Sequence, residues 1–155
     1  MFNIIVAESR NHIIGNNNKI PWNYKEDIKY FKKITTESNN NEKNIIIMGY
    51  NTWISIGKIL PNRINIVINK NSDKILDYQD ENLYFSRDFN ELINNFNNLK
   101  NIKLFFNNIF VIGGEKIYNE ALKNKYLDKI YLKKINKNIN GDRYFPKLLD
   151  SFELI

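Results

Sequence analysis

The chain has no cysteine, one histidine, three prolines and six glycines in 155 residues. The lack of cysteine excludes a disulfide scaffold and a thiolate metal site. The single histidine, His12, excludes a cluster of histidine ligands and makes a Ser-His-Asp triad improbable, because it lies in a polar segment after the first predicted strand. We therefore expect no metal site.

Long apolar runs are also missing, so no segment is predicted to cross a membrane. Met1 leads directly into a strand pattern rather than into a signal peptide, which favours a cytoplasmic protein. The net charge is +6, but the lysines are scattered and no cluster of five basic residues occurs. This pattern disfavours a nucleic-acid partner and fits an acidic, phosphorylated small molecule at least as well.

The composition that remains, 43% hydrophobic and 14% aromatic, is that of one globular domain over residues 1–155. Hydrophobic patterns predict a long loop over residues 9–23 and helices at 24–36, 51–56, 89–98 and 115–124. They predict strands at 2–8, 44–48, 63–68, 82–85, 108–112, 129–135 and 152–155. Since strands alternate with helices and several are apolar on both faces, we expect an α/β three-layer sandwich with a mostly parallel central sheet.

The first predicted helix carries a carboxylate on an apolar face. Asp27, Phe31 and Thr35 are four residues apart and so share one side of the helix. Burying a carboxylate costs several kcal/mol unless a partner is present, and such groups are suited to ligand pairing and proton handling. The alternative is that Asp27 only complements the dipole at the helix start.

Two predicted strands end in glycine just before a helix, at Gly49 and at Gly113-Gly114. Glycine and a helix N-terminus let an anionic ligand approach the backbone, although plain turns have the same composition. Two such junctions in a basic chain suit a dinucleotide, but the three-glycine Rossmann fingerprint is absent. Arg63 follows a Pro-Asn turn and is either a fork for a carboxylate or a solvated turn residue.

Taken together, these residues resemble the dihydrofolate reductase family over residues 2–155. The motifs that carry the resemblance occur in the family's order: Ile5-Val6-Ala7, Ile14-Gly15, Pro21-Trp22 with Asp27 and Phe31, Met48-Gly49 with Thr52-Trp53 and Ser55-Ile56, Leu60-Pro61 with Arg63 and Asn65, Val111-Ile112-Gly113-Gly114 with Tyr118, and Gly141-Asp142 with Phe145-Pro146. The resemblance implies an eight-stranded, mostly parallel sheet with four helices. It also implies NADPH-dependent reduction of 7,8-dihydrofolate to 5,6,7,8-tetrahydrofolate.

The resemblance assigns the substrate side of the site. Asp27 pairs with N3 and the 2-amino group of the pterin, Trp22 joins it as a catalytic residue, and Arg63 clamps the glutamate carboxylate. Hydride passes to pterin C6, water delivers the proton to N5, and the loop over residues 15–23 acts as a lid. The implied substrate-binding residues are Ile5, Val6, Asp27, Phe31, Ser55, Ile56, Leu60, Arg63, Ile112 and Tyr118.

The resemblance also assigns a cofactor side, and in the family the Gly113–Gly114 peptide is cis. Position 50 carries Arg or Lys in the family but Tyr50 here, so Lys70 and Lys116 are expected to contact the 2′-phosphate, with Arg87 packing on adenine. The implied cofactor-binding residues are Ala7, Ile14, Gly15, Gly49, Asn51, Thr52, Lys70, Arg87, Gly113, Gly114, Lys116 and Ile117.

Lys133 and Arg143 stand where the family has threonine. Strand alternation places Lys133 on the pocket face, where it either pairs with Asp27 or carries its amine to solvent, and we favour the solvent position. The chain stops inside the first strand of the family's closing hairpin. We therefore expect either a fragment or another segment in the gap, and fusion to or association with a further domain.

Three alternatives remain open. A pyrimidine reductase of riboflavin synthesis shares the fold but lacks the Pro-Trp pair with the helix carboxylate. A catalytically impaired reductase-like domain would serve as a binding module or as the front half of a fused protein. A basic nucleic-acid binder is the least favoured, because no clustered basic face is predicted.

Overall fold

The computed structural model describes residues 1–17, 25–39, 41–98 and 104–146. The predictions for Trp22, for residues 18–24 of the loop and for a strand at 152–155 lie outside the described residues. The elements are β1 (Phe2–Ser9), β2 (Ile13–Gly15), α1 (Lys25–Thr36), β3 (Asn44–Gly49), α2 (Tyr50–Ile56), β4 (Arg63–Ile68), β5 (Asp77–Asp80), β6 (Leu83–Ser86), α3 (Phe89–Asn98), β7 (Ile109–Gly113), α4 (Glu115–Leu122), β8 (Leu127–Ile135) and β9 (Arg143–Tyr144).

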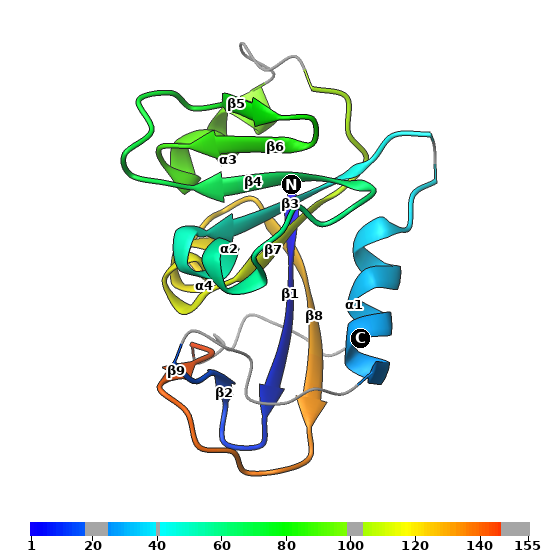
Figure 1. The fold of residues 1–155 in the computed structure, drawn as a ribbon, viewed down its shortest axis with the longest axis vertical. Coiled ribbons are helices and arrows are strands. Elements are labelled where there is room, and N and C mark those ends of the chain that lie inside the picture. Colours follow the sequence, from blue (N-terminus) through cyan, green and yellow to red (C-terminus); the bar gives the residue numbers. More distant parts are fainter. Residues whose placement is uncertain (18–24, 40, 99–103, 147–155) are drawn as a thin grey trace.

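The main sheet has seven described strands in the order β5-β6-β4-β3-β7-β1-β8 (Figure 1). Every pairing in it is parallel except β5 with β6. The central strands β3, β4 and β7 are buried along almost their whole length, as expected of parallel strands covered on both faces. The predicted mostly parallel α/β sheet is confirmed.

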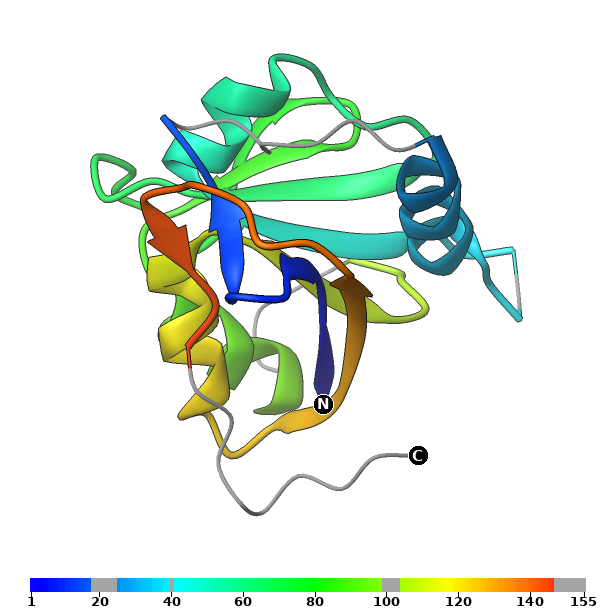
Figure 2. The same ribbon diagram turned by 90° about the horizontal axis from the view of Figure 1, so that it is seen from below.

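Helices cover both faces of this sheet (Figure 2). On β3, Ile45 and Ile47 pack in the core under α3 and α4, whereas Ile46 and Met48 pack in the core under α1 and α2. This alternation follows from the two-residue period of a strand. The three-layer sandwich is thus built by strands that are apolar on both faces. Among the described residues, no helix is long and apolar enough to span a membrane.

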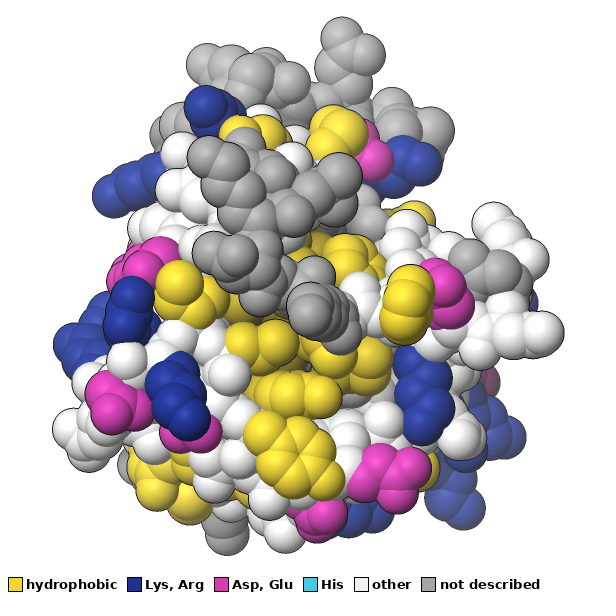
Figure 3. Space-filling view, turned by 90° about the horizontal axis from the view of Figure 1, so that it is seen from above, with side chains coloured by type: hydrophobic (Ala, Val, Ile, Leu, Met, Phe, Trp, Pro, Cys, Tyr) yellow, Lys and Arg dark blue, Asp and Glu magenta, His cyan; other side chains and the backbone are white. Residues whose placement is uncertain are grey.

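Three short strands, β2, β5 and β9, were not predicted. β2 lies inside the segment predicted as a loop and pairs antiparallel with β9, and β5 forms the edge of the main sheet. Strands of two to four residues give too little alternation to be recognised. β5 has the polar sequence Asp-Tyr-Gln-Asp, and charged side chains protect such an edge from pairing with another chain. Figure 3 shows this end of the molecule, with hydrophobic side chains near its middle and charged ones toward the rim.

The β2–β9 pair depends on one close backbone approach at Gly141. A Cβ atom added there would lie 2.5 Å from the carbonyl oxygen of Gly15 and 2.5 Å from Cγ2 of Ile13. The same approach lets the Asp142 N–H donate to the Gly15 carbonyl oxygen at 3.1 Å. Only glycine fits without moving this segment away from β2.

Gly141→Ala should therefore lower the free energy of unfolding by about 1–3 kcal/mol, because the backbones must separate to admit the methyl group. Urea denaturation followed by circular dichroism measures the loss. Asn140→Ala is the matched control, since Asn140 is exposed, and it should change stability by no more than about 0.5 kcal/mol. Equal stability of the two variants would contradict the close approach.

Candidate active site

A cavity of about 1410 Å³ opens at the carboxyl ends of the parallel strands. Ala7 of β1, Gly49 of β3, Ile68 of β4 and Gly113 of β7 line it, together with residues of α1, α2 and α4. Ligands of open α/β sheets bind at this edge. Of the predicted site residues that the structure describes, all line the cavity except Arg63 and Arg87.

The two glycine junctions meet at one end of the cavity. The Gly113–Gly114 peptide is cis, as the family resemblance implied. A Cβ atom on Gly114 would lie 3.3 Å from Oγ1 of Thr52, and one on Gly49 would lie 3.2 Å from Cγ1 of Ile117. Gly49 therefore packs closely against α4 and Gly114 against α2. Both glycines line the cavity, where no side chain separates their backbone from a ligand.

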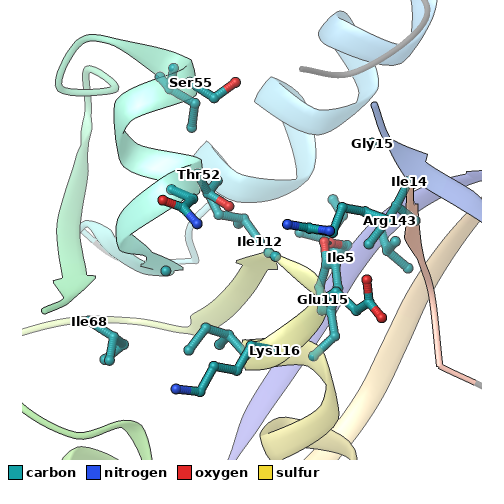
Figure 4. A pocket seen from close by; sticks show the side chains of 18 of the residues that line it. Ile5, Ile14, Gly15, Thr52, Ser55, Ile68, Ile112, Glu115, Lys116 and Arg143 are labelled. Atoms are coloured by element: carbon teal, nitrogen blue, oxygen red, sulfur yellow. The ribbon is translucent and has the colours of Figure 1, made fainter. Parts of the chain in front are cut away.

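Figure 4 shows Arg143 extending into the cavity from β9 and Lys116 projecting from α4. Thr52 and Ser55 on α2 form another side of the same space. Arg143 reaches this position because Gly141 holds its segment against β2. The walls of the glycine end thus come from elements that are far apart in the sequence.

Two lysines meet beside this end. Lys116 lowers the pKa of Lys70, by a side-chain hydrogen bond and by repulsion between the two charges. Burial raises the pKa of the nearby Glu120 carboxyl, and the charges of Lys116 and Lys70 oppose this shift. Two cations in contact favour an anionic ligand between them.

Asp27 lies in the first turn of α1, at the other end of the cavity. Its side chain is 12% exposed, and Oδ1 is 3.4 Å from the Lys133 amine. Oδ2 is buried and accepts no hydrogen bond from the described residues. The expectation that the Lys133 amine escapes to solvent is therefore wrong. The β8 backbone points this side chain at α1, and the buried carboxylate attracts it.

Arg63 is 3% exposed, so it is not a solvated turn residue. Its Nε donates to the Pro61 carbonyl oxygen at 2.9 Å and its Nη1 donates to Thr35 Oγ1 at 3.0 Å. The guanidinium carbon lies 6.0 Å from the ring centroid of Phe31, which lines the cavity. Burial lowers the pKa of Arg63, and the described residues hold no carboxylate within ion-pair distance of it.

The structure does not bring Arg87 to the cavity. Its Nε donates to Glu91 Oε2 at 2.9 Å, and its Nη1 donates to the Asp73 carbonyl oxygen at 2.8 Å. The pair with Glu91 raises the pKa of Arg87 and lowers that of Glu91. Glu91 and Asp73 thus hold the guanidinium of Arg87 on the surface beside α3, away from the cavity.

Sequence reasoning missed several lining residues. Three of these are Asn119 and Glu120 on α4 and Lys123 directly after it, which follow Lys116 by three, four and seven positions and so lie on its side of the helix. That spacing was a usable signal. Tyr118, which was predicted, is held by its hydroxyl, which donates to the Ile5 carbonyl oxygen at 2.9 Å, and burial raises its pKa.

A parallel sheet with one large cavity at its carboxyl edge, glycine junctions and cations at one end and a buried carboxylate at the other, is typical of α/β enzymes that bind a nucleotide beside a second substrate. The sequence profile of the dihydrofolate reductase family matches residues 1–155. The chain belongs to the dihydrofolate reductase family. It is thus an oxidoreductase, and the family uses a nicotinamide cofactor.

Among its relatives is a dihydrofolate reductase of Buchnera aphidicola subsp. Baizongia pistaciae. It is 39% identical over 143 residues, which are 92% of this chain and 76% of the relative. A bifunctional dihydrofolate reductase-thymidylate synthase of Acanthamoeba polyphaga mimivirus is 38% identical, over 96% of this chain and 27% of the relative. A protein of Mycoplasmoides gallisepticum named segregation and condensation protein A is 33% identical over 100% of this chain and 23% of its own length. Similar sequences thus also occur within longer proteins.

Proposed function

We propose that this chain reduces 7,8-dihydrofolate to 5,6,7,8-tetrahydrofolate with NADPH, by hydride transfer to pterin C6. The observation that carries the proposal is the large cavity at the carboxyl edge of the sheet, with Asp27 at one end and the Gly113–Gly114 junction, with Lys70 and Lys116, at the other. A cytoplasmic location and a role in one-carbon metabolism accompany it.

On the substrate side, Asp27 offers its buried Oδ2 as an acceptor for the N3–H and 2-amino groups of the pterin. Ile5, Phe31 and Leu60 contribute apolar walls that exclude water. Arg63 supplies a buried positive charge for the glutamate carboxylate. Asp27 holds and polarises the ring, and water brings the proton to N5.

On the cofactor side, Gly49 and Gly114 line the cavity, and because they carry no side chain their backbones are open to a diphosphate. Nicotinamide, when bound, supplies the hydride. Ala7, Ile14, Gly15 and Ile112 would hold its ring, Asn51 and Thr52 the diphosphate, and Lys70 and Lys116 the 2′-phosphate. For Arg87, contact with adenine stays a prediction without support from its present contacts.

Asp27→Asn should lower kcat for dihydrofolate at neutral pH by about 100-fold or more, because the ring loses its charged acceptor. The loss should shrink at acid pH, where the substrate arrives already protonated. Steady-state NADPH oxidation measures both. Glu26→Gln removes the same charge from the neighbouring, exposed position and should leave kcat unchanged. Full activity of Asp27→Asn at neutral pH would refute the assigned role.

Arg63→Ala should raise the KM for dihydrofolate by about 10- to 150-fold, because a charge-assisted hydrogen bond is worth about 1.5–3 kcal/mol. A dihydropterin without the glutamate tail is the control substrate, and its KM should hardly change. If the KM values of both substrates rise together, Arg63 supports the pocket only through Thr35 and Pro61.

Lys70 and Lys116 should determine the preference for NADPH. Replacing both with Ala should weaken NADPH binding by about tenfold and leave NADH binding nearly unchanged, because only NADPH carries the 2′-phosphate. Fluorescence titration of each cofactor gives the dissociation constants. Parallel weakening of NADPH and NADH would instead assign these lysines to general attraction of anions.

The binding-module alternative has one supporting observation, the ion pair that occupies Asp27. A measured turnover that is lost in Asp27→Asn would exclude the binding-module alternative. Asp27 also opposes a pyrimidine reductase, which lacks the helix carboxylate. Association with a further domain stays a prediction, and the mimivirus and Mycoplasmoides relatives, which are several times longer than this chain, support it.

A further inference from the structure

Adjacent lysines on β8 pair with carboxylates on opposite faces of the sheet. In the parallel register, Lys133 lies beside Ala7 and Lys134 beside Glu8. Because side chains alternate along a strand, Lys133 faces α1 and Lys134 faces away from it. The Lys134 amine is 3.0 Å from Glu8 Oε1, and the Lys133 amine is 3.4 Å from Asp27 Oδ1.

The carboxylates of Glu8 and Asp27 differ in how many of their oxygens have a partner. Glu8 is occupied at both oxygens, because its Oε2 also contacts His12 Nδ1 at 3.1 Å. Asp27 is occupied only at Oδ1, and its buried Oδ2 has no hydrogen-bond partner among the described residues. Asp27 therefore presents Oδ2 as a free acceptor, while the amine of Lys133 balances the negative charge of the carboxylate.

Contacts with two residues of α1 hold the amine of Lys133 in place. Its amine lies 5.4 Å from the ring centroid of Tyr30, so the cation interacts with that ring as well as with Asp27. Tyr30 and Asp27 are three residues apart on α1 and share one helix face. Asp27 and Lys133 also line both the large cavity and an outer groove of about 440 Å³, so the ion pair forms the wall between the two.

We propose that Lys133 is a built-in counter-ion that determines ligand specificity at Asp27, by favouring neutral heterocycles that donate N–H groups over protonated, cationic ones. The proposal rests on the proposed function. A neutral donor needs only the free Oδ2, which the lysine leaves in place. A cation must in addition lie near the Lys133 charge, in a site where Coulomb terms are stronger than in water.

The test uses two probes that differ in one group, folic acid and 4-amino-4-deoxyfolic acid. The 4-amino group makes the ring basic enough to bind as a cation beside a carboxylate, whereas folic acid binds neutral. Dissociation constants are measured by fluorescence quenching at neutral pH without cofactor. Lys133→Met should tighten binding of the 4-amino analogue by about tenfold and leave folic acid nearly unchanged.

Lys129→Met is the matched control. Lys129 is exposed and lies on the same strand and face as Lys133, about 13 Å away, so both variants lose one positive charge. It should shift neither probe. Lys134→Met is unsuitable as a control, because it would strip the buried Glu8 of its lysine partner. Lys133→Arg keeps the charge and should keep the discrimination.

An equal shift of both probes in Lys133→Met, or the same selective shift in Lys129→Met, would overturn the proposal. An unchanged ratio of the two dissociation constants in Lys133→Met would also overturn it. Adding Asp27→Asn to Lys133→Met should abolish the gain for the cationic probe, since the gain depends on the freed carboxylate. These are binding measurements, so failure of the proposed reduction appears separately, as missing turnover in the wild-type protein.

Discussion

The structure depends on the burial of β3, β4 and β7 on both faces. Each strand carries isoleucine or valine on both sides, and burying one such side chain is worth about 1.5–3 kcal/mol. Strands of this kind need helices above and below, and the crossover connections make them parallel. Their carboxyl ends then meet at one edge. The cavity exists at that edge because the chain must turn there from strands into helices.

Close backbone approaches shape the ligand end of this edge. Gly49 and Gly114 lie within contact distance of α4 and α2 side chains, and Gly141 brings the β9 segment against β2. In each case the missing side chain is what allows the approach. The short β2–β9 pair then carries Gly15 and Arg143 to the cavity.

Charged groups in and beside the cavity fall into three arrangements. Lys70 and Lys116 repel each other and leave positive charge for a ligand, whereas Lys133 and Asp27 neutralise each other at the opposite end. Arg63 is a third case, a buried cation whose described contacts are only neutral oxygens. These arrangements differ in their need for a ligand. Under the proposed function, an anion would complete the arrangements at Lys70 and Arg63, and a neutral donor would complete the one at Asp27.

Composition and period predicted the α/β class, the mostly parallel sheet, the four helices and the two glycine junctions, because apolar runs and glycine at strand ends are local signals. Family resemblance supplied most of the cavity-lining residues and the roles proposed for Asp27 and Gly113-Gly114. Tertiary structure alone decided that Lys133 pairs with Asp27, that Arg87 is held by Glu91, and that β2 pairs with β9. The reach of a long charged side chain depends on carboxylates supplied by other elements, which no sequence period encodes. Two-residue strands form only where a distant segment offers a partner.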